Sequence, residues 1–100
     1  MKIVAVTSCS TGIAQTYMAA DVLERCARAQ GHTIKVETQG ALGILNPISL
    51  AEIKSADLAI ITCDVPIEDV ARFRAIKTIE VTIDDILKSP QVIIKSLSVV

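Results

Sequence analysis

The chain has 100 residues, 51% of them hydrophobic and 21% charged, which suits one compact domain spanning residues 1–100 and argues against disorder. A net charge of −1, the lack of any Lys or Arg run and an aromatic content of 2% argue against a nucleic-acid partner. No apolar stretch reaches about 18 residues, and Met1 leads straight into a strand-like run. We therefore expect a cytoplasmic protein without a signal peptide.

The number and spacing of the cysteines and histidine argue against disulfide bonds and a zinc site. Cys9, Cys26 and Cys63 are odd in number and widely spaced, which is not the pattern of a disulfide framework. His32 is the single histidine of the sequence, and no Cys-x-x-Cys pair is present, so a zinc site is not expected. The sequence therefore predicts neither a metal nor another cofactor.

The first part of the chain is predicted to form a buried strand and an amphipathic helix. Residues 3–6 are a short apolar run rich in β-branched side chains, which is typical of a buried strand. A polar, turn-forming segment follows at 7–12. Residues 13–30 carry polar side chains at helical spacing, and Gly31 stands where a C-terminal cap is expected. The core-facing arc of this helix is expected to include Tyr17, Met18 and Cys26, with the alternative that Tyr17 or Met18 is exposed beside Cys9 for docking.

The rest of the chain continues to alternate strands with helices. Residues 33–38 and 78–83 alternate polar and apolar side chains, which predicts half-exposed strands, whereas the apolar run at 58–61 predicts a second buried strand. Ser49 and Glu52 form a capping-box pattern at the start of a short helix over 49–55. The remaining predicted segments are a loop at 39–47, a weak helix at 67–74 and one or two short helices within 84–100, interrupted at Ser89-Pro90.

This β-α-β-α-β-α-β-α order is typical of a three-layer α/β/α domain with a parallel sheet and helices on both faces. The two continuously apolar strands belong at the centre and the two alternating strands at the edges. With right-handed crossovers, the result is a four-stranded sheet in the order 2-1-3-4, which is flavodoxin-like. Ligands bind such sheets at the carboxyl ends of the first and third strands. The residues at those ends are Cys9 and Cys63-Asp64.

Cys9 is the candidate nucleophile, because it stands between the first strand and the N-terminus of the first helix. A helix N-terminus presents unpaired N–H groups and a partial positive charge, which favour a phosphate and stabilise a thiolate. Gly12 permits a tight turn there, while Ser10, Thr11 and Thr16 add hydroxyl donors. A thiolate facing a bound phosphoryl group is placed for attack. The alternative is that Cys9 is only a small buried hydrophobic residue.

The same loop limits the kind of reaction. It lacks both Gly-x-Gly-x-x-Gly and a Gly-Lys-Ser/Thr sequence, so it is neither a Rossmann nor a Walker loop. It is similar to the Cys-x5-Arg loop of low-molecular-weight tyrosine phosphatases, but Gln15 replaces the arginine that stabilises a hydrolytic transition state. The loop should therefore form a phosphocysteine and hydrolyse it slowly. The alternatives are a small cysteine-dependent phosphatase or reductase, and a non-catalytic anion-binding regulator.

The chain resembles the fructose-family (fructose-like) IIB components of the phosphoenolpyruvate-dependent sugar phosphotransferase system. The resemblance is carried by residues 2–16, Lys-Ile-Val-Ala-Val-Thr-Ser-Cys-Ser-Thr-Gly-Ile-Ala-Gln-Thr, and by residues 18–20. Residues 35–40, Gly43 and Asp64 match as well. Because the resemblance covers nearly the whole chain, it implies that residues 1–100 are one such IIB domain.

The resemblance implies a phosphoryl carrier. Cys9 would accept phosphate from a phosphohistidine of a IIA partner. It would then pass the group to a sugar, fructose or fructose-like, imported through a membrane IIC component. The family usually has Pro at the position of Ser10 and His at that of Gln15, so we expect slower transfer, an altered partner preference or an unusual sugar. The residues that would surround the phosphoryl oxygens are Ser10, Thr11, Gly12, Ile13, Ala14, Gln15 and Thr16.

Residues at the ends of neighbouring strands are candidates for a supporting role. Asp64, Gln39 and Gly40 are expected beside the Cys9 loop, where they would orient its amides, line the site or contact a partner. For each of them the alternative is an ordinary turn. Cys63 ends the neighbouring strand, and a passive thiol is favoured over a redox partner for Cys9. His32 is expected to be a solvated residue at a helix end.

Overall fold

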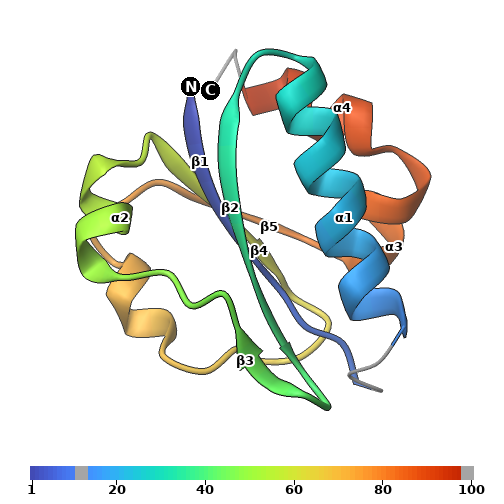
Figure 1. Ribbon diagram of the computed structural model, residues 1–100, viewed down its shortest axis with the longest axis vertical. Helices are drawn as coiled ribbons and strands as arrows, with labels where there is room; N and C mark the ends of the chain where they lie inside the picture. The colour runs from blue at the N-terminus through green and yellow to red at the C-terminus, as the bar shows by residue number, and fades with distance from the viewer. Residues whose placement is uncertain (11–13, 98–100) are drawn as a thin grey trace.

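A five-stranded, mostly parallel sheet forms the centre of the computed structural model, which describes residues 1–10 and 14–97 (Figure 1). The strands lie in the order β3-β2-β1-β4-β5. Their bounds are Lys2–Thr7 for β1, Thr33–Gly40 for β2, Gly43–Leu45 for β3, Leu58–Thr62 for β4 and Thr78–Val81 for β5. The four parallel strands thus have the predicted order, with β1 and β4 at the centre.

The central strands are buried on both faces because their sequences carry apolar side chains at consecutive positions. All five residues of β4 are buried, as are all residues of β1 after Lys2. The two strands pair in parallel, with Val4 beside Ala59 and Val6 beside Ile61. A continuous apolar run is typical of a parallel strand covered by helices on both sides. The burial of these two strands is therefore set by their local sequence.

The predicted loop at 39–47 and the predicted strand count were wrong. β2 continues to Gly40, and β3 pairs antiparallel with it, so the sheet has a fifth strand at its edge. Gly43 opens β3 at φ +85°, a conformation that glycine adopts without a steric penalty. A strand of three residues is too short to show an alternating pattern. Its neighbouring glycines and proline therefore suggested a loop.

Helices cover both faces of the sheet and make the predicted three layers. Figure 1 shows α1, Ala14–Ala29, on one side together with α3, Ile83–Lys88, and α4, Pro90–Leu97. The other side carries α2, Leu50–Ser55, and the 3-10 helix η1, Val70–Phe73. Apolar side chains from the two faces of the sheet pack into two separate clusters, one under each helical layer. No helix among residues 1–10 and 14–97 is long and apolar enough to cross a membrane.

The helix boundaries follow local sequence signals with one exception. Ser49 accepts a hydrogen bond from the Glu52 N–H at 3.2 Å, and Glu52 accepts one from the Ser49 N–H at 2.9 Å, which confirms the predicted capping box. The predicted interruption between α3 and α4 is also present, since α4 begins at Pro90. The weak helix expected over 67–74 is reduced to η1. Its preceding residue, Asp69, has a left-handed backbone (φ 58°) that cannot continue a right-handed helix.

Candidate functional site

Cys9 lies at the carboxyl end of β1, on the side of the sheet that α1 covers. The residue is half-buried and packs against the apolar cluster under α1. Its Sγ lies 3.0 Å from the Oγ1 of Thr16, a fully buried residue in the first turn of that helix. Thr7 in β1 donates from Oγ1 to the Thr16 carbonyl at 3.0 Å. The Thr7 hydroxyl therefore ties the end of β1 to the first turn of α1, and the Thr16 hydroxyl contacts the Cys9 sulfur.

The residues expected to bind phosphoryl oxygens divide by burial. Ser10, Ala14 and Gln15 are exposed, whereas Thr16 is buried and uses its hydroxyl on the cysteine sulfur. Three further residues expected in this set lie outside the described part of the chain: Thr11, Gly12 and Ile13. Cys9 nevertheless stands at the N-terminal end of a 16-residue helix, where the first N–H groups and the helix dipole favour an anion.

Ser8 and Thr62 tie the two central strands together immediately before Cys9. The Ser8 N–H donates to Thr62 Oγ1 at 2.9 Å, and the same hydroxyl donates to the Ser8 carbonyl at 3.1 Å. One buried threonine side chain therefore satisfies both backbone groups of Ser8, at the point where β1 has ended. Sequence reasoning did not single out this pair. The available signal was a hydroxyl-bearing residue at the end of each central strand.

Gln39 connects the end of β2 to two other segments. Its carbonyl accepts a hydrogen bond from Ser8 Oγ at 2.8 Å. Its side-chain Oε1 accepts from the Glu68 N–H at 2.7 Å, while Nε2 donates to the Glu68 carbonyl at 3.2 Å and to Glu37 Oε2 at 2.8 Å. Gly40, also expected near the site, is half-buried and pairs with Gly43 in the hairpin. Gln39 thus contacts the segment that leads into Cys9 through its main chain and not through its amide group.

Glu37 contradicts the expectation that its strand is half-exposed on that face. Its side chain is 0% exposed and forms a two-point ion pair with Arg72, at 2.5 Å and 2.7 Å. Burial would by itself raise the pKa of Glu37. Hydrogen bonds from Arg72, Gln39 and the Ile48 N–H, together with the charge of Arg72, outweigh that effect and hold this pKa below its ordinary value. The local sequence does not predict this burial, because an acidic residue in an alternating strand normally indicates a solvated face. Arg72, the buried partner of Glu37, is 35 residues away in sequence.

Asp64 and Cys63 follow β4 and lie in different environments. Asp64 Oδ1 accepts a hydrogen bond from the Ile83 N–H at 2.8 Å, so it caps the start of α3. Cys63 is exposed and lines a cavity of about 310 Å³ with Ile61 and Ile67, which belong to the cluster under α2 and η1. Cys9 packs in the cluster on the opposite face of the sheet. This placement favours a passive Cys63 thiol.

The residues expected on the buried arc of α1 have different environments. Met18 is 54% exposed, so its predicted core position was wrong; the helix turns it outward just after the Cys9 loop. Tyr17 is half-buried, and its hydroxyl accepts from the Leu42 N–H at 3.4 Å. His32 is also half-buried, and its main-chain N–H donates to the Ala27 carbonyl. The His32 Nδ1 is buried and has no hydrogen-bond partner among the described residues.

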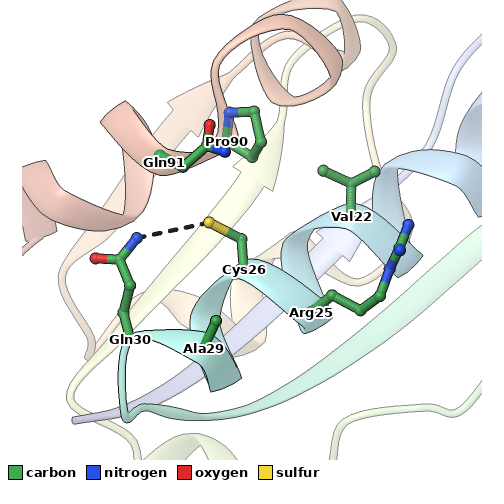
Figure 2. A pocket seen from close by; sticks show the side chains of 7 residues that line it. All are labelled: Val22, Arg25, Cys26, Ala29, Gln30, Pro90 and Gln91. Atoms are coloured by element: carbon green, nitrogen blue, oxygen red, sulfur yellow. Dashed lines mark hydrogen bonds between the residues drawn. The ribbon is translucent and has the colours of Figure 1, made fainter.

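Cys26 is half-buried, packs against the cluster under α1 and accepts a hydrogen bond from Gln30 Nε2 at 3.6 Å. Figure 2 shows it in a cavity of about 340 Å³ between the later turns of α1 and the start of α4. The residues that line this cavity are Val22, Arg25, Cys26, Ala29, Gln30, Pro90 and Gln91. None of them belongs to the Cys9 loop, so the cavity is separate from the candidate site.

The fold and the site together define a doubly wound α/β domain with a cysteine at the topological switch point of its sheet. A sequence family described as "PTS system, Lactose/Cellobiose specific IIB subunit" matches residues 4–96. The chain is 42% identical over 96 residues to the "PTS system fructose-like EIIB component 2" of Escherichia coli (strain K12), covering 96% of this chain and 91% of that protein. It therefore belongs to the IIB family of the sugar phosphotransferase system, and curated relatives that it matches are named fructose-like or fructose-specific.

Further relatives agree with this assignment. The "Fructose-like PTS system EIIBC component" of Escherichia coli (strain K12) is 47% identical over 91 residues, which are 89% of this chain and 19% of that protein. The solved structure of a predicted fructose-specific IIB from Escherichia coli has a TM-score of 0.91 and 34% identity, and covers 97% of this chain and 86% of that one. A domain of a fructose-specific IIABC component from Borrelia burgdorferi has a TM-score of 0.89 and 42% identity, covering 95% and 90%.

Proposed function

We propose that this chain is a phosphoryl carrier in which Cys9 accepts a phosphoryl group from a phosphohistidine of a IIA partner. Cys9 then passes the group to a sugar, fructose or a related one, as a membrane IIC component imports it. The carrying observation is the position of the Cys9 sulfur at the carboxyl end of β1, 3.0 Å from the Thr16 hydroxyl in the first turn of α1. This role places the domain in the cytoplasm, where donor and sugar meet.

The proposed transfer proceeds in two displacements. The Cys9 thiolate attacks phosphorus, an S–P bond forms, the P–N bond of the donor breaks, and the imidazole leaves with the electron pair of that bond. A sugar hydroxyl oxygen then attacks phosphorus and gives up its proton to a base or to water. The S–P bond breaks in this second step, and its electron pair returns to the Cys9 thiolate. Thr16 would donate a hydrogen bond to the sulfur in its anionic form.

The surrounding loop supports a carrier over a hydrolase. Main-chain N–H groups of residues 10–16 would hold the phosphoryl oxygens at the start of α1. Gln15 has no guanidinium to stabilise attack by water, which favours a phosphocysteine that persists until a sugar arrives. The relative whose name joins IIB and IIC in one EIIBC component supports a membrane IIC partner.

The decisive experiment incubates the purified protein with a phosphorylated IIA donor and measures its intact mass. We expect the wild-type chain to gain one phosphoryl group and Cys9→Ser to gain none, because serine at this position supplies no thiolate. Cys26→Ser and Cys63→Ser are matched controls and should be phosphorylated like the wild type. Phosphate on Cys9→Ser would contradict the proposal. Rapid release of free phosphate from an aryl phosphate, without any donor, would favour a phosphatase instead.

A further inference from the structure

The buried ion pair between Glu37 and Arg72 forms hydrogen bonds with several neighbouring segments. The Arg72 side chain is 8% exposed and donates to both oxygens of Glu37, to the Ile48 carbonyl at 2.9 Å and to the Asp69 carbonyl at 3.0 Å. The Ile48 N–H donates to Glu37 Oε1 at 2.9 Å. A charged pair so enclosed is weak evidence for stability, because desolvation offsets much of the attraction. Its geometry is better explained by what it holds in place.

Glu37 Oε2 accepts a hydrogen bond from Gln39 Nε2 at 2.8 Å in addition to those from Arg72. This contact orients the Gln39 amide. The Glu37 carboxylate can only accept hydrogen bonds, so the NH2 group of the amide must face it. The amide oxygen is then free to accept from the Glu68 N–H at 2.7 Å. The Gln39 amide is therefore held on both sides: its nitrogen bonds to Glu37 of the ion pair, and its oxygen bonds to Glu68 in the segment that follows β4.

Gln39 is connected to Cys9 through one further residue, Ser8. The Gln39 carbonyl accepts from Ser8 Oγ at 2.8 Å, and Ser8 immediately precedes Cys9. Both backbone groups of Ser8 are also bonded to Thr62 in β4. Ser8 is thus held from β2 on one side and from β4 on the other, and it is 6% exposed. The direction in which the chain leaves β1 towards Cys9 depends on these two attachments.

We propose that Ser8 and Gln39 are positioning residues for Cys9, and that the Glu37–Arg72 pair serves this function by fixing the Gln39 amide. The inference rests on the proposed function, because positioning matters only if Cys9 must meet a phosphoryl group at a defined distance. A displacement of the nucleophile by about 1 Å can slow a reaction by about 100-fold. Neither Ser8 nor Gln39 touches the phosphoryl group in this account. Both act through the backbone that carries the sulfur.

The test uses a background with Cys26→Ser and Cys63→Ser, in which Cys9 is the sole thiol. Ser8→Ala removes the bond to the Gln39 carbonyl, and Gln39→Met removes the amide bonds while keeping a side chain of similar length. Matched controls are Ser96→Ala in α4 and Gln91→Met at its start, both remote from Cys9 in sequence and on another element. For each variant, phosphoryl transfer from a IIA donor is measured against donor concentration, and Cys9 alkylation by iodoacetamide is timed without any donor.

We expect Ser8→Ala and Gln39→Met to slow transfer at saturating donor by about tenfold, a fraction of the loss that 1 Å of displacement can produce. The half-saturating donor concentration should stay the same, and the controls should behave like the background. Transfer at the background rate in both variants would overturn the proposal. So would a change confined to the half-saturating concentration, since it would make these residues part of the donor interface.

Failure of the proposed function has a different signature. In that case the background protein itself would gain no phosphate from any donor tested. The alkylation rates would still decide the positioning claim, because they report the environment of the Cys9 sulfur without a phosphoryl group. An altered rate in Ser8→Ala and Gln39→Met, with unaltered controls, supports positioning. Identical rates in all variants would refute it.

Discussion

Glu37 is the residue whose environment departs furthest from its local sequence. It lies in a strand where Ile34 and Val36 alternate with Lys35, and Lys35 does reach the surface to pair with Glu52 at 2.8 Å. Glu37 instead turns into the protein, where Arg72 and the Ile48 N–H satisfy both of its oxygens. Removing one member of such a pair leaves the other buried and uncompensated. Breaking this buried pair should therefore cost more stability than breaking an exposed ion pair.

The Arg72→Met substitution tests this account of Glu37. Because it leaves a buried carboxylate without its cation, we expect the free energy of unfolding to fall by about 3–5 kcal/mol. Chemical denaturation followed by circular dichroism measures the change. Lys88→Met is the matched control, since it breaks the exposed pair with Asp84 and should leave stability nearly unchanged. Equal effects of the two substitutions would show that Glu37 recovers its solvation without Arg72.

At the scale of elements, short helices on the sheet faces depend on their first turns. α2 has six residues, and so has α3, and both begin with a complete capping box. Helices this short are marginal in isolation, so bonds at their ends are a large share of what holds them. In α2 the same Glu52 also pairs with Lys35 of β2, and the hydrogen bond from Lys35, followed by that from the Ser49 N–H, lowers the pKa of Glu52 to about 2. Its carboxylate thus joins the helix start to the sheet.

Ser49→Ala should weaken α2 because it removes the hydroxyl that accepts from the Glu52 N–H. The expected loss in the free energy of unfolding is about 1 kcal/mol, the usual cost of replacing an N-cap serine. Thermal unfolding measured by calorimetry would detect it. The matched control is Ser96→Ala inside α4, where alanine is a better helix former than serine and no loss is expected. Unchanged stability of the Ser49→Ala variant would mean that the packing of Ile53 and the Glu52–Lys35 pair hold the helix without its N-cap.

At the scale of the whole molecule, two apolar clusters clamp the sheet between its helical layers. The cluster under α1, α3 and α4 contains Ile60, which is fully buried in the middle of β4. The cluster under α2 and η1 contains Val4, Val6 and Phe73. Since the central strands contribute alternate residues to each cluster, neither layer can loosen without exposing the same two strands. Unfolding should therefore be cooperative.

Ile60→Ala probes this shared core. We expect a loss of about 2–5 kcal/mol in the free energy of unfolding, from lost burial and from the cavity left behind. Urea denaturation monitored with two independent signals would give both the loss and the cooperativity. Val92→Ala is the control, because Val92 is largely exposed on α4 and its truncation should change stability by less than about 0.5 kcal/mol. Two separate transitions in the Ile60→Ala variant would contradict a shared core.

The sequence by itself determined the order of the four parallel strands, the capping box of α2 and the position of Cys9 between a strand and a helix. Each of these follows from a short local pattern: an apolar run, a Ser-x-x-Glu pattern, or a polar loop that precedes residues with helical spacing. The family resemblance added the expected chemistry of Cys9, which stays a proposal, while the comparisons show that the chain is a IIB component.

The tertiary structure alone decided the short edge strand β3, the outward position of Met18, and the buried contacts that lead from Arg72 to Ser8. The contacts from Arg72 to Ser8 join residues distant in sequence, and all three features depend on what surrounds them in space. A glutamate in an alternating strand has the same local pattern whether water or a buried arginine satisfies it. Only the tertiary structure, which brings Arg72 of η1 to Glu37 of β2, selects the buried arginine.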